Sequence, residues 1–149
     1  MRNILLLGLL MTLVGCMTTG MKVQFRPASD SPSAGLTEMT VAGSGKKVFI
    51  AQDVVLANED FEFARLIQKP DGLQVEFVMS KTGIERYMRA KSDNRVKPFA
   101  ILVNGRLICA PFTLEDCLVS GKITEFTFAL GGYFSDQDAR MIVDGINNK

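Results

Sequence analysis

Three cysteines, at positions 16, 109 and 117, are the residues of this 149-residue sequence with the widest chemical range. The sequence contains no histidine, which removes the most frequent general base, the commonest zinc ligand and the usual pH switch. Ser80-Lys81 and Ser120-Gly121-Lys122 have the residue types of a Ser–Lys dyad but lack a supporting motif. We therefore predict no catalytic residue, no metal site and no cofactor.

Four carboxylates are also candidates for a chemical role because of their positions. Glu115 and Asp116 precede Cys117, and Asp136 and Asp138 lie at an expected helix start. Acidic residues are favourable in the first turn of a helix because they interact with its positive end. We interpret the first pair as solvated loop residues and the second pair as helix-capping residues.

The first cysteine follows a short export leader. Met1-Arg2-Asn3 carries positive charge, and residues 4–14 form an apolar run interrupted only by Thr12. Eleven residues are too few to span a bilayer, which takes about 20, but they fit the apolar region of a signal peptide. Leu13-Val14-Gly15-Cys16 resembles the bacterial lipobox. An ordinary signal peptide that happens to contain a cysteine is the alternative.

Lipidation of Cys16 would anchor the mature chain in a membrane. We predict removal of residues 1–15, a diacylglycerol thioether on Cys16, and a lipidated tether over residues 16–22. Each buried methylene contributes about 0.8 kcal/mol, so several acyl chains anchor stably. Met17, rather than aspartate, follows the cysteine. This favours the periplasmic side of the outer membrane in a Gram-negative cell, or otherwise the outer face of the plasma membrane.

Composition predicts a packed domain without a nucleic-acid partner. The chain is 47% hydrophobic and 22% charged, which is typical of globular proteins. Loss of Arg2 with the leader reduces the 17 Lys and Arg residues to 16, which equals the 16 Asp and Glu residues. A mature chain without basic surplus lacks the charge that nucleic-acid phosphates attract.

Cys109 and Cys117 would remain after lipidation of Cys16. Exported proteins enter an oxidising compartment, so we predict a structural disulfide between them. Closing a loop of about nine residues would contribute roughly 2.6 kcal/mol by chain entropy. Seven residues separate the two thiols, which is not the spacing of C-x-x-C disulfide exchangers. Two free buried cysteines, or redox or metal chemistry, are the alternatives.

Residues 23–149 are expected to form one α+β domain. Alternating or apolar segments predict strands at 48–51, 61–67, 73–79, 99–103, 106–109 and 123–130, together with a brief strand ended by Pro27. Asn104-Gly105 predicts a two-residue hairpin. Ser80 and Ser135 predict the starts of two helices, although Gly83 is unfavourable within the first. We expect a mainly antiparallel sheet with both helices packed on one face.

The second half of the sequence also matches a known pattern. Its members are a glycine at a helix start, a polar turn, an apolar strand ending in Asn-Gly, an Ala-Pro step, and a glycine–aromatic–serine segment before an alanine-containing helix. The matching residues are Gly83, Asn94, Lys97, Ala100-Ile101-Leu102-Val103-Asn104-Gly105, Ala110-Pro111, Gly132-Tyr133-Phe134-Ser135 and Ala139. In these residues the chain resembles the head subdomain in the first periplasmic region of SecD, the accessory subunit of the Sec protein translocase.

The match is weaker upstream and has three departures. Gly35-Leu36-Thr37-Glu38 and Ala51-Gln52-Asp53-Val54-Val55 are similar to the lead-in of small exported proteins with this module. Lys91 replaces a frequent threonine, Arg95-Val96 replaces a glycine-containing turn, and the Cys109/Cys117 pair is not part of the pattern. SecD also depends on transmembrane helices for its proton-linked work. We therefore expect the fold to carry over and the proton-linked activity not to.

The resemblance implies a non-catalytic accessory or binding module. Its expected partner is an exported polypeptide or an envelope protein complex, contacted by a domain held at the membrane through its lipid. Two alternatives remain: a structural or regulatory envelope lipoprotein with no link to protein export, and a hydrolase.

Overall fold

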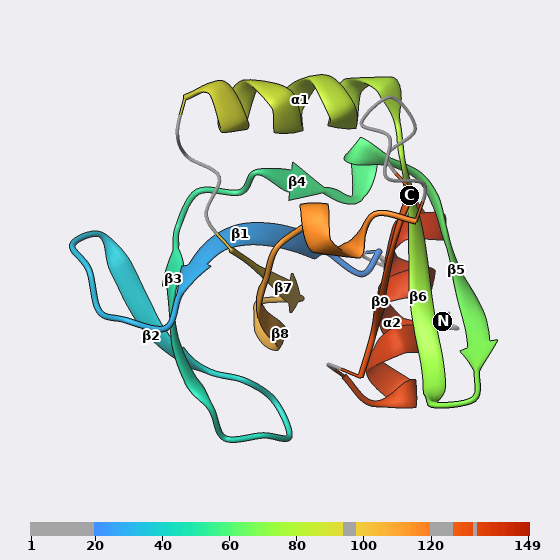
Figure 1. Ribbon diagram of the computed structural model, residues 1–149, viewed down its shortest axis with the longest axis horizontal. Helices are drawn as coiled ribbons and strands as arrows, with labels where there is room; N and C mark the ends of the chain where they lie inside the picture. Colours follow the sequence, from blue (N-terminus) through green and yellow to red (C-terminus); the bar gives the residue numbers. More distant parts are fainter. Residues whose placement is uncertain (1–19, 94–97, 120–126, 133) are drawn as a thin grey trace, which may run out of the picture.

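The computed structural model describes residues 20–93, 98–119, 127–132 and 134–149. Its strands are divided between two antiparallel sheets, which lie side by side in Figure 1 with helix α2 against the smaller one and helix α1 along the top. The predicted leader, Cys16 and most of the predicted tether lie outside the described residues. So do Ser120–Lys122, Asn94, Lys97 and Tyr133, and the first part of the strand predicted at 123–130.

The larger sheet contains six strands in the order β2-β3-β1-β7-β8, with β4 also paired to β1. The bounds are β1 Val23–Ser29, β2 Leu36–Thr40, β3 Lys47–Ala51, β4 Leu56–Ala57, β7 Phe99–Val103 and β8 Arg106–Phe112. The strands β7 and β8 form the hairpin predicted from Asn104-Gly105. Both turn residues have the positive φ that this turn requires, 50° and 79°.

The smaller sheet has the strand order β5-β6-β9. Its bounds are β5 Phe61–Lys69, β6 Gly72–Met79 and β9 Thr127–Gly131. Helix α1 spans Lys81–Ser92 and helix α2 spans Asp136–Asn147, while the short 3-10 turns η1 and η2 span Asn58–Asp60 and Glu115–Cys117. Both helices contact β6, and α2 also contacts β5. The predicted α+β fold is confirmed, but the strands form two sheets and not the single sheet predicted from the sequence.

One apolar core joins the sheets and the helices. Phe25 from the larger sheet meets Phe61 and Phe77 from the smaller sheet with ring centroids 5.2 and 5.5 Å apart. Helix α1 contributes Tyr87 to this core, and helix α2 contributes residues including Ile142. Both predicted N-caps are confirmed, because the hydroxyls of Ser80 and Ser135 accept hydrogen bonds from the backbone three residues later. The two helices therefore begin where the sequence predicts and close over shared apolar side chains.

Pro27 does not end its strand, contrary to the sequence prediction, and β8 continues through Pro111, beyond the predicted end of that strand at residue 109. Pro27 lies inside β1, at the point where that strand changes its partner from β4, opposite Phe25, to β3, opposite Ala28. A missing N–H is tolerated there because no ladder bond is required at the junction. Pro111 lies inside β8, which pairs only with β7 among the described strands. Proline is accommodated in edge strands for the same reason.

Candidate functional site

Strand β5 is the longest of the described strands and lies at one edge of the smaller sheet. Strand β5 has nine residues and pairs with β6 on one side. Among the described residues, no strand pairs with it on the other side. An edge strand presents N–H and C=O groups that can bond to another extended chain. Phe63, on this strand, is a large apolar side chain that remains 40% exposed.

The end of α2 shows which backbone groups face this edge. The Asn147 side-chain amide accepts a hydrogen bond from the Ala64 N–H at 2.9 Å and donates one to the Ala64 C=O at 2.8 Å. The backbone groups of Ala64 therefore point away from β6. Pairing between β5 and β6 is regular from Phe63 onward, and backbone direction alternates along an antiparallel strand. Leu66 and Gln68 therefore direct their N–H and C=O groups to the same edge.

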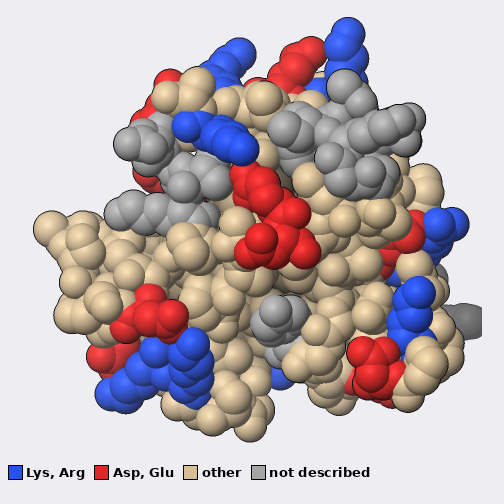
Figure 2. All heavy atoms as spheres, in the orientation of Figure 1, with Lys and Arg blue, Asp and Glu red and all other residues tan. Residues whose placement is uncertain are grey.

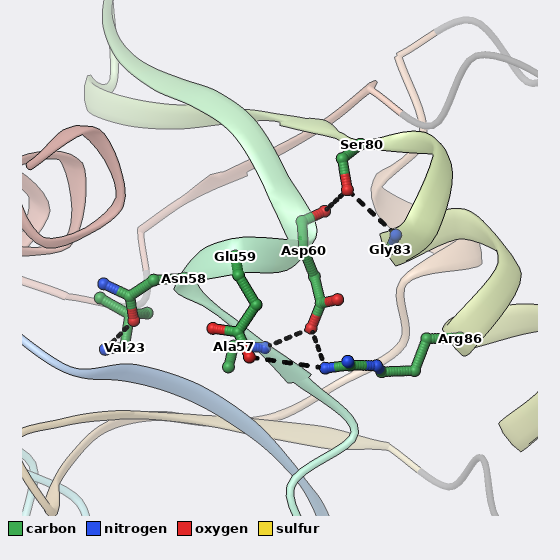
Figure 3. A network of polar contacts seen from close by, with 8 residues as sticks. All are labelled: Val23, Ala57, Asn58, Glu59, Asp60, Ser80, Gly83 and Arg86. Atoms are coloured by element: carbon green, nitrogen blue, oxygen red, sulfur yellow. Dashed lines mark hydrogen bonds and ion pairs between the residues drawn. The ribbon is translucent and has the colours of Figure 1, made fainter. Parts of the chain in front are cut away.

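A polar junction centred on η1 fixes the start of β5 (Figure 3). The Asn58 side chain accepts a hydrogen bond from the Val23 N–H at 2.7 Å and donates to the carbonyl oxygens of Met21 and Gly145. One amide thus joins the beginning of β1, the η1 turn and helix α2. Because these segments are distant in sequence, this junction sets how the two sheets meet.

Asp60 ties the same turn to α1. Its buried carboxylate accepts hydrogen bonds from the Ala57 N–H at 2.8 Å and from the Arg86 guanidinium at 2.9 Å. Its backbone oxygen accepts hydrogen bonds from the N–H and the hydroxyl of Ser80, at 2.9 and 3.1 Å. Ser80 is therefore a capping residue engaged in the fold, not half of a Ser–Lys dyad.

The buried carboxylate of Asp60 is only partly compensated. Burial raises its pKa, although the Ala57 N–H and the Arg86 charge act in the opposite direction. Its Oδ1 atom has no hydrogen-bond partner in the described part of the chain. Glu59, exposed beside it, approaches Arg86 to 3.7 Å. The cluster can hold α1 in place, but it shows no paired acid and base aimed at an open site.

Gly83 is required where α1 meets η1. A Cβ atom built at this position would lie 2.1 Å from the Asp60 backbone oxygen. Only glycine allows so close an approach, because it has no side chain. The glycine that weakened the helix prediction is therefore a packing residue. The likeness to the SecD pattern at this position thus has a structural cause.

An open pocket of about 720 Å³ adjoins the junction. The start of the described chain, the η1 turn, α1 and the residues after α2 all contribute to its lining. Its lining residues include Met21, Lys22, Asn58, Glu59, Arg86 and Lys149. The Lys149 ammonium also donates a hydrogen bond to the carbonyl oxygen of Phe61, so the pocket continues into the beginning of the β5 edge.

The acidic residues singled out in the sequence have structural roles. Glu115 accepts hydrogen bonds from the Tyr87 hydroxyl at 2.6 Å and the Lys91 ammonium at 2.9 Å. These bonds lower the pKa of Glu115, although burial acts against them. Ser135 caps α2 by accepting a hydrogen bond from the Asp138 N–H, while the Asp138 carboxylate accepts one from the Ser135 hydroxyl at 2.9 Å and pairs with Arg106 at 3.1 Å. Asp136 and Asp138 thus lie in the first turn of α2, as expected, but the capping side chain is that of Ser135, and Glu115 is not merely solvated.

The two remaining cysteines are neighbouring free thiols in the structure. Cys109 is fully buried in β8 and Cys117 is half-buried at the end of η2. Burial, with a smaller contribution from nearby Cys117, raises the pKa of Cys109 to about 12. Burial and the Asp116 carboxylate raise the pKa of Cys117. The predicted disulfide is not formed in this structure, and the pairing stays a prediction.

Oxidation tests this pairing directly. Mild oxidation of the purified protein is expected to lower its mass by two hydrogens, and reduction should restore it. In the reduced protein, alkylation should reach Cys117 well before Cys109, because Cys109 is buried and its thiolate is disfavoured. The Cys117→Ser variant should lose roughly 2 to 3 kcal/mol of unfolding free energy relative to the oxidised protein. Two free thiols after oxidation would contradict the pairing.

No metal cluster and no membrane-spanning helix occur in the described part of the molecule. No group of three or more cysteine and acidic side chains there could hold a metal ion. None of the helices described combines the length and the apolar character needed to cross a bilayer.

Figure 2 shows Lys and Arg side chains interspersed with Asp and Glu on one face, rather than gathered into a patch of one sign.

Comparisons with known proteins place the fold. A structure of SecDF, a membrane component that enhances protein export, superposes with a TM-score of 0.55 at 17% identity, over 85% of this chain and 62% of that chain. The fold is SecD-like. A second SecDF structure, in a form described as super-membrane-facing, gives a TM-score of 0.54 at 18% identity, over 84% of this chain.

The similarity between this chain and SecDF is a similarity of fold. The chain spans 62% of the first SecDF chain and 18% of the second. No family model matches the sequence, and no curated protein sequence matches it. The resemblance stated from the sequence pattern is thus confirmed at the level of three-dimensional structure.

Proposed function

We propose that this protein is a non-catalytic, lipid-anchored envelope module that binds an extended polypeptide segment along the edge of β5. The observation that carries the proposal is the row of outward-facing backbone groups at Leu66 and Gln68, beside the exposed Phe63 side chain. Edge strands bind extended peptides by backbone pairing, and adjacent side chains add specificity. Such binding needs no catalytic residue.

The SecD-like fold supports an exported polypeptide, or a protein of an envelope complex, as the source of that segment. SecDF enhances protein export, and a chain in transit is extended and offers unpaired backbone groups. The proposed lipid on Cys16 would hold the pocket and the edge near the membrane surface, on the periplasmic side of the outer membrane or on the outer face of the plasma membrane. Only three residues separate Cys16 from the first described residue, Gly20.

A pair of variants at Gln68 tests the edge. Gln68→Pro removes the outward N–H without removing a bond between β5 and β6, whereas Gln68→Ala keeps that N–H. The proline variant is expected to bind an extended nine-residue peptide of alternating glutamate and valine about two- to twelve-fold more weakly than the parent protein. That loss corresponds to a net hydrogen bond of about 0.5 to 1.5 kcal/mol. The alanine variant should bind like the parent protein.

Cells supply the second half of the test. A photoreactive residue at Gln68 should crosslink to exported polypeptides above the level found for the same residue at Lys81, on the exposed start of α1. Equal crosslinking at both positions, together with equal peptide binding by the Gln68 variants, would overturn the proposed edge. Crosslinking to one resident envelope protein alone would favour a structural or regulatory role without a link to export.

A further inference from the structure

The side chain of Asn147 imitates a residue of an added strand. In an antiparallel pair, two facing residues exchange both of their N–H to O=C hydrogen bonds. The Asn147 amide makes this exchange with Ala64, at 2.9 and 2.8 Å, from 83 residues away in sequence. A primary amide carries the same donor and acceptor as a peptide group. One pairing position on the β5 edge is therefore already occupied.

The occupied and open positions form one continuous line. Lys149 bonds the carbonyl oxygen of Phe61 and Asn147 bonds Ala64, so the end of α2 and the residues after it cover the first part of β5. The described residues make no hydrogen bond to the outward groups of Leu66 and Gln68. A segment that pairs with Leu66 and Gln68 would meet Asn147 at its next position.

The contact between the Asn147 side chain and Ala64 can be broken without disturbing the buried part of α2. Asn147 is the exposed last residue of α2, and its side chain makes both of its hydrogen bonds within the described residues to Ala64. Release of its side chain would leave the buried face of the helix, including Ile142 and Ile146, in place. The hydrogen bonds lost by Ala64 would be replaced by equivalent bonds from an incoming strand. The exchange therefore leaves Ala64 with the same number and kind of hydrogen bonds.

We propose that Asn147 is a displaceable cap of the β5 edge, which an extended polypeptide replaces at Ala64 when it pairs with the strand. This inference rests on the proposed function, because it takes the same edge as the binding site. While Asn147 occupies Ala64, only Leu66 and Gln68 among the described residues of this edge remain open for pairing in the free protein. The cap thereby limits unspecific strand addition, which exposed edges otherwise invite. A bound segment would run from Ala64 to Gln68.

Amide exchange in the free protein tests the cap without any partner. The Ala64 amide should exchange slowly in the parent protein and at least about ten-fold faster in Asn147→Ala, because its acceptor is gone. Asn148→Ala is the matched control, since Asn148 is also exposed but does not bond Ala64. Equal Ala64 exchange in the parent and in Asn147→Ala would overturn the cap. A melting curve of each variant verifies that only folded protein is compared.

Peptide binding tests the exchange. The nine-residue peptide of alternating glutamate and valine should protect the Leu66 and Gln68 amides in the parent protein, and in Asn147→Ala it should protect the Ala64 amide as well. It should bind Asn147→Ala about ten-fold more tightly than the parent. A ten-fold change corresponds to about 1.4 kcal/mol, near the net value of one hydrogen bond. Asn147→Asp, which keeps the acceptor but loses the donor, should fall between them.

The two proposals fail in different ways. Protection of Leu66 and Gln68 with the same affinity in the parent and Asn147→Ala would overturn the cap and leave the edge as the binding site. No protection in any variant would overturn both the edge and the exchange, even if Asn147 shields Ala64 in the free protein.

Discussion

A Cys16→Ser chain is expected to leave the membrane fraction completely and to incorporate no labelled palmitate in growing cells. The thioether to diacylglycerol requires the sulfur, and serine cannot replace it in this position. Acyl chains contribute about 0.8 kcal/mol for each buried methylene, so their loss removes many kilocalories of membrane binding at once. Fractionation of cells that express the parent and the variant at equal levels measures this effect.

Cys117→Ser is the matched control for the loss of a thiol. It removes a half-buried cysteine of the domain and should leave both palmitate incorporation and membrane fractionation unchanged. If the parent protein itself carries no label, residues 1–15 act as an ordinary signal peptide and Cys16 is an unmodified residue. Label that persists in Cys16→Ser would place the lipid on another residue.

Local signals in the sequence predict the local elements well. The two caps depend on a hydroxyl and a backbone N–H three residues away, and the β7–β8 hairpin depends on two adjacent residues that tolerate positive φ. Such signals are complete within a few positions. The hairpin from β5 to β6 is of the same kind, because Gly72 supplies a φ of 128°. These elements therefore begin and end close to where the sequence analysis expects them.

The errors arise where a distant strand decides the outcome. A proline reads as a strand terminator when only its own segment is considered. Pro27 remains inside β1 because that strand has different partners on either side of it, which only the folded sheet determines. Strands β2 and β4 were not predicted, and β4 has two residues whose strand character depends on pairing with β1. The division into two sheets is likewise a property of long-range pairing.

The candidate site consists almost entirely of such long-range contacts. Asn147 meets Ala64, and Asn58 meets both Met21 and Gly145. Asparagine at a helix end or in a short turn has ordinary local explanations, so its type and spacing carry no signal of these partners. The one advance signal was Gly83, whose presence in a helix runs against propensity. A residue that is locally unfavourable often marks a packing requirement.

A Gly83→Ala protein is expected to lose about 3 kcal/mol of unfolding free energy. The added Cβ would lie 2.1 Å from the Asp60 oxygen and 2.9 Å from its carbonyl carbon, so α1 must move away from η1. Overpacking typically costs 1 to 3 kcal/mol, and this shift also strains the bonds that Ser80 and Arg86 make to Asp60. Urea denaturation followed by circular dichroism measures the loss.

The sign of this effect makes the test decisive. At an open position in a helix, replacing glycine by alanine stabilises a protein by about 0.5 to 1 kcal/mol. Thr82→Ala changes the neighbouring exposed residue of the same turn and should stay within about 0.5 kcal/mol of the parent. A stabilised Gly83→Ala protein would show that α1 does not pack against the Asp60 backbone. Destabilisation with Thr82→Ala unchanged would support this contact, through which α1 is held against the turn that leads into the β5 edge.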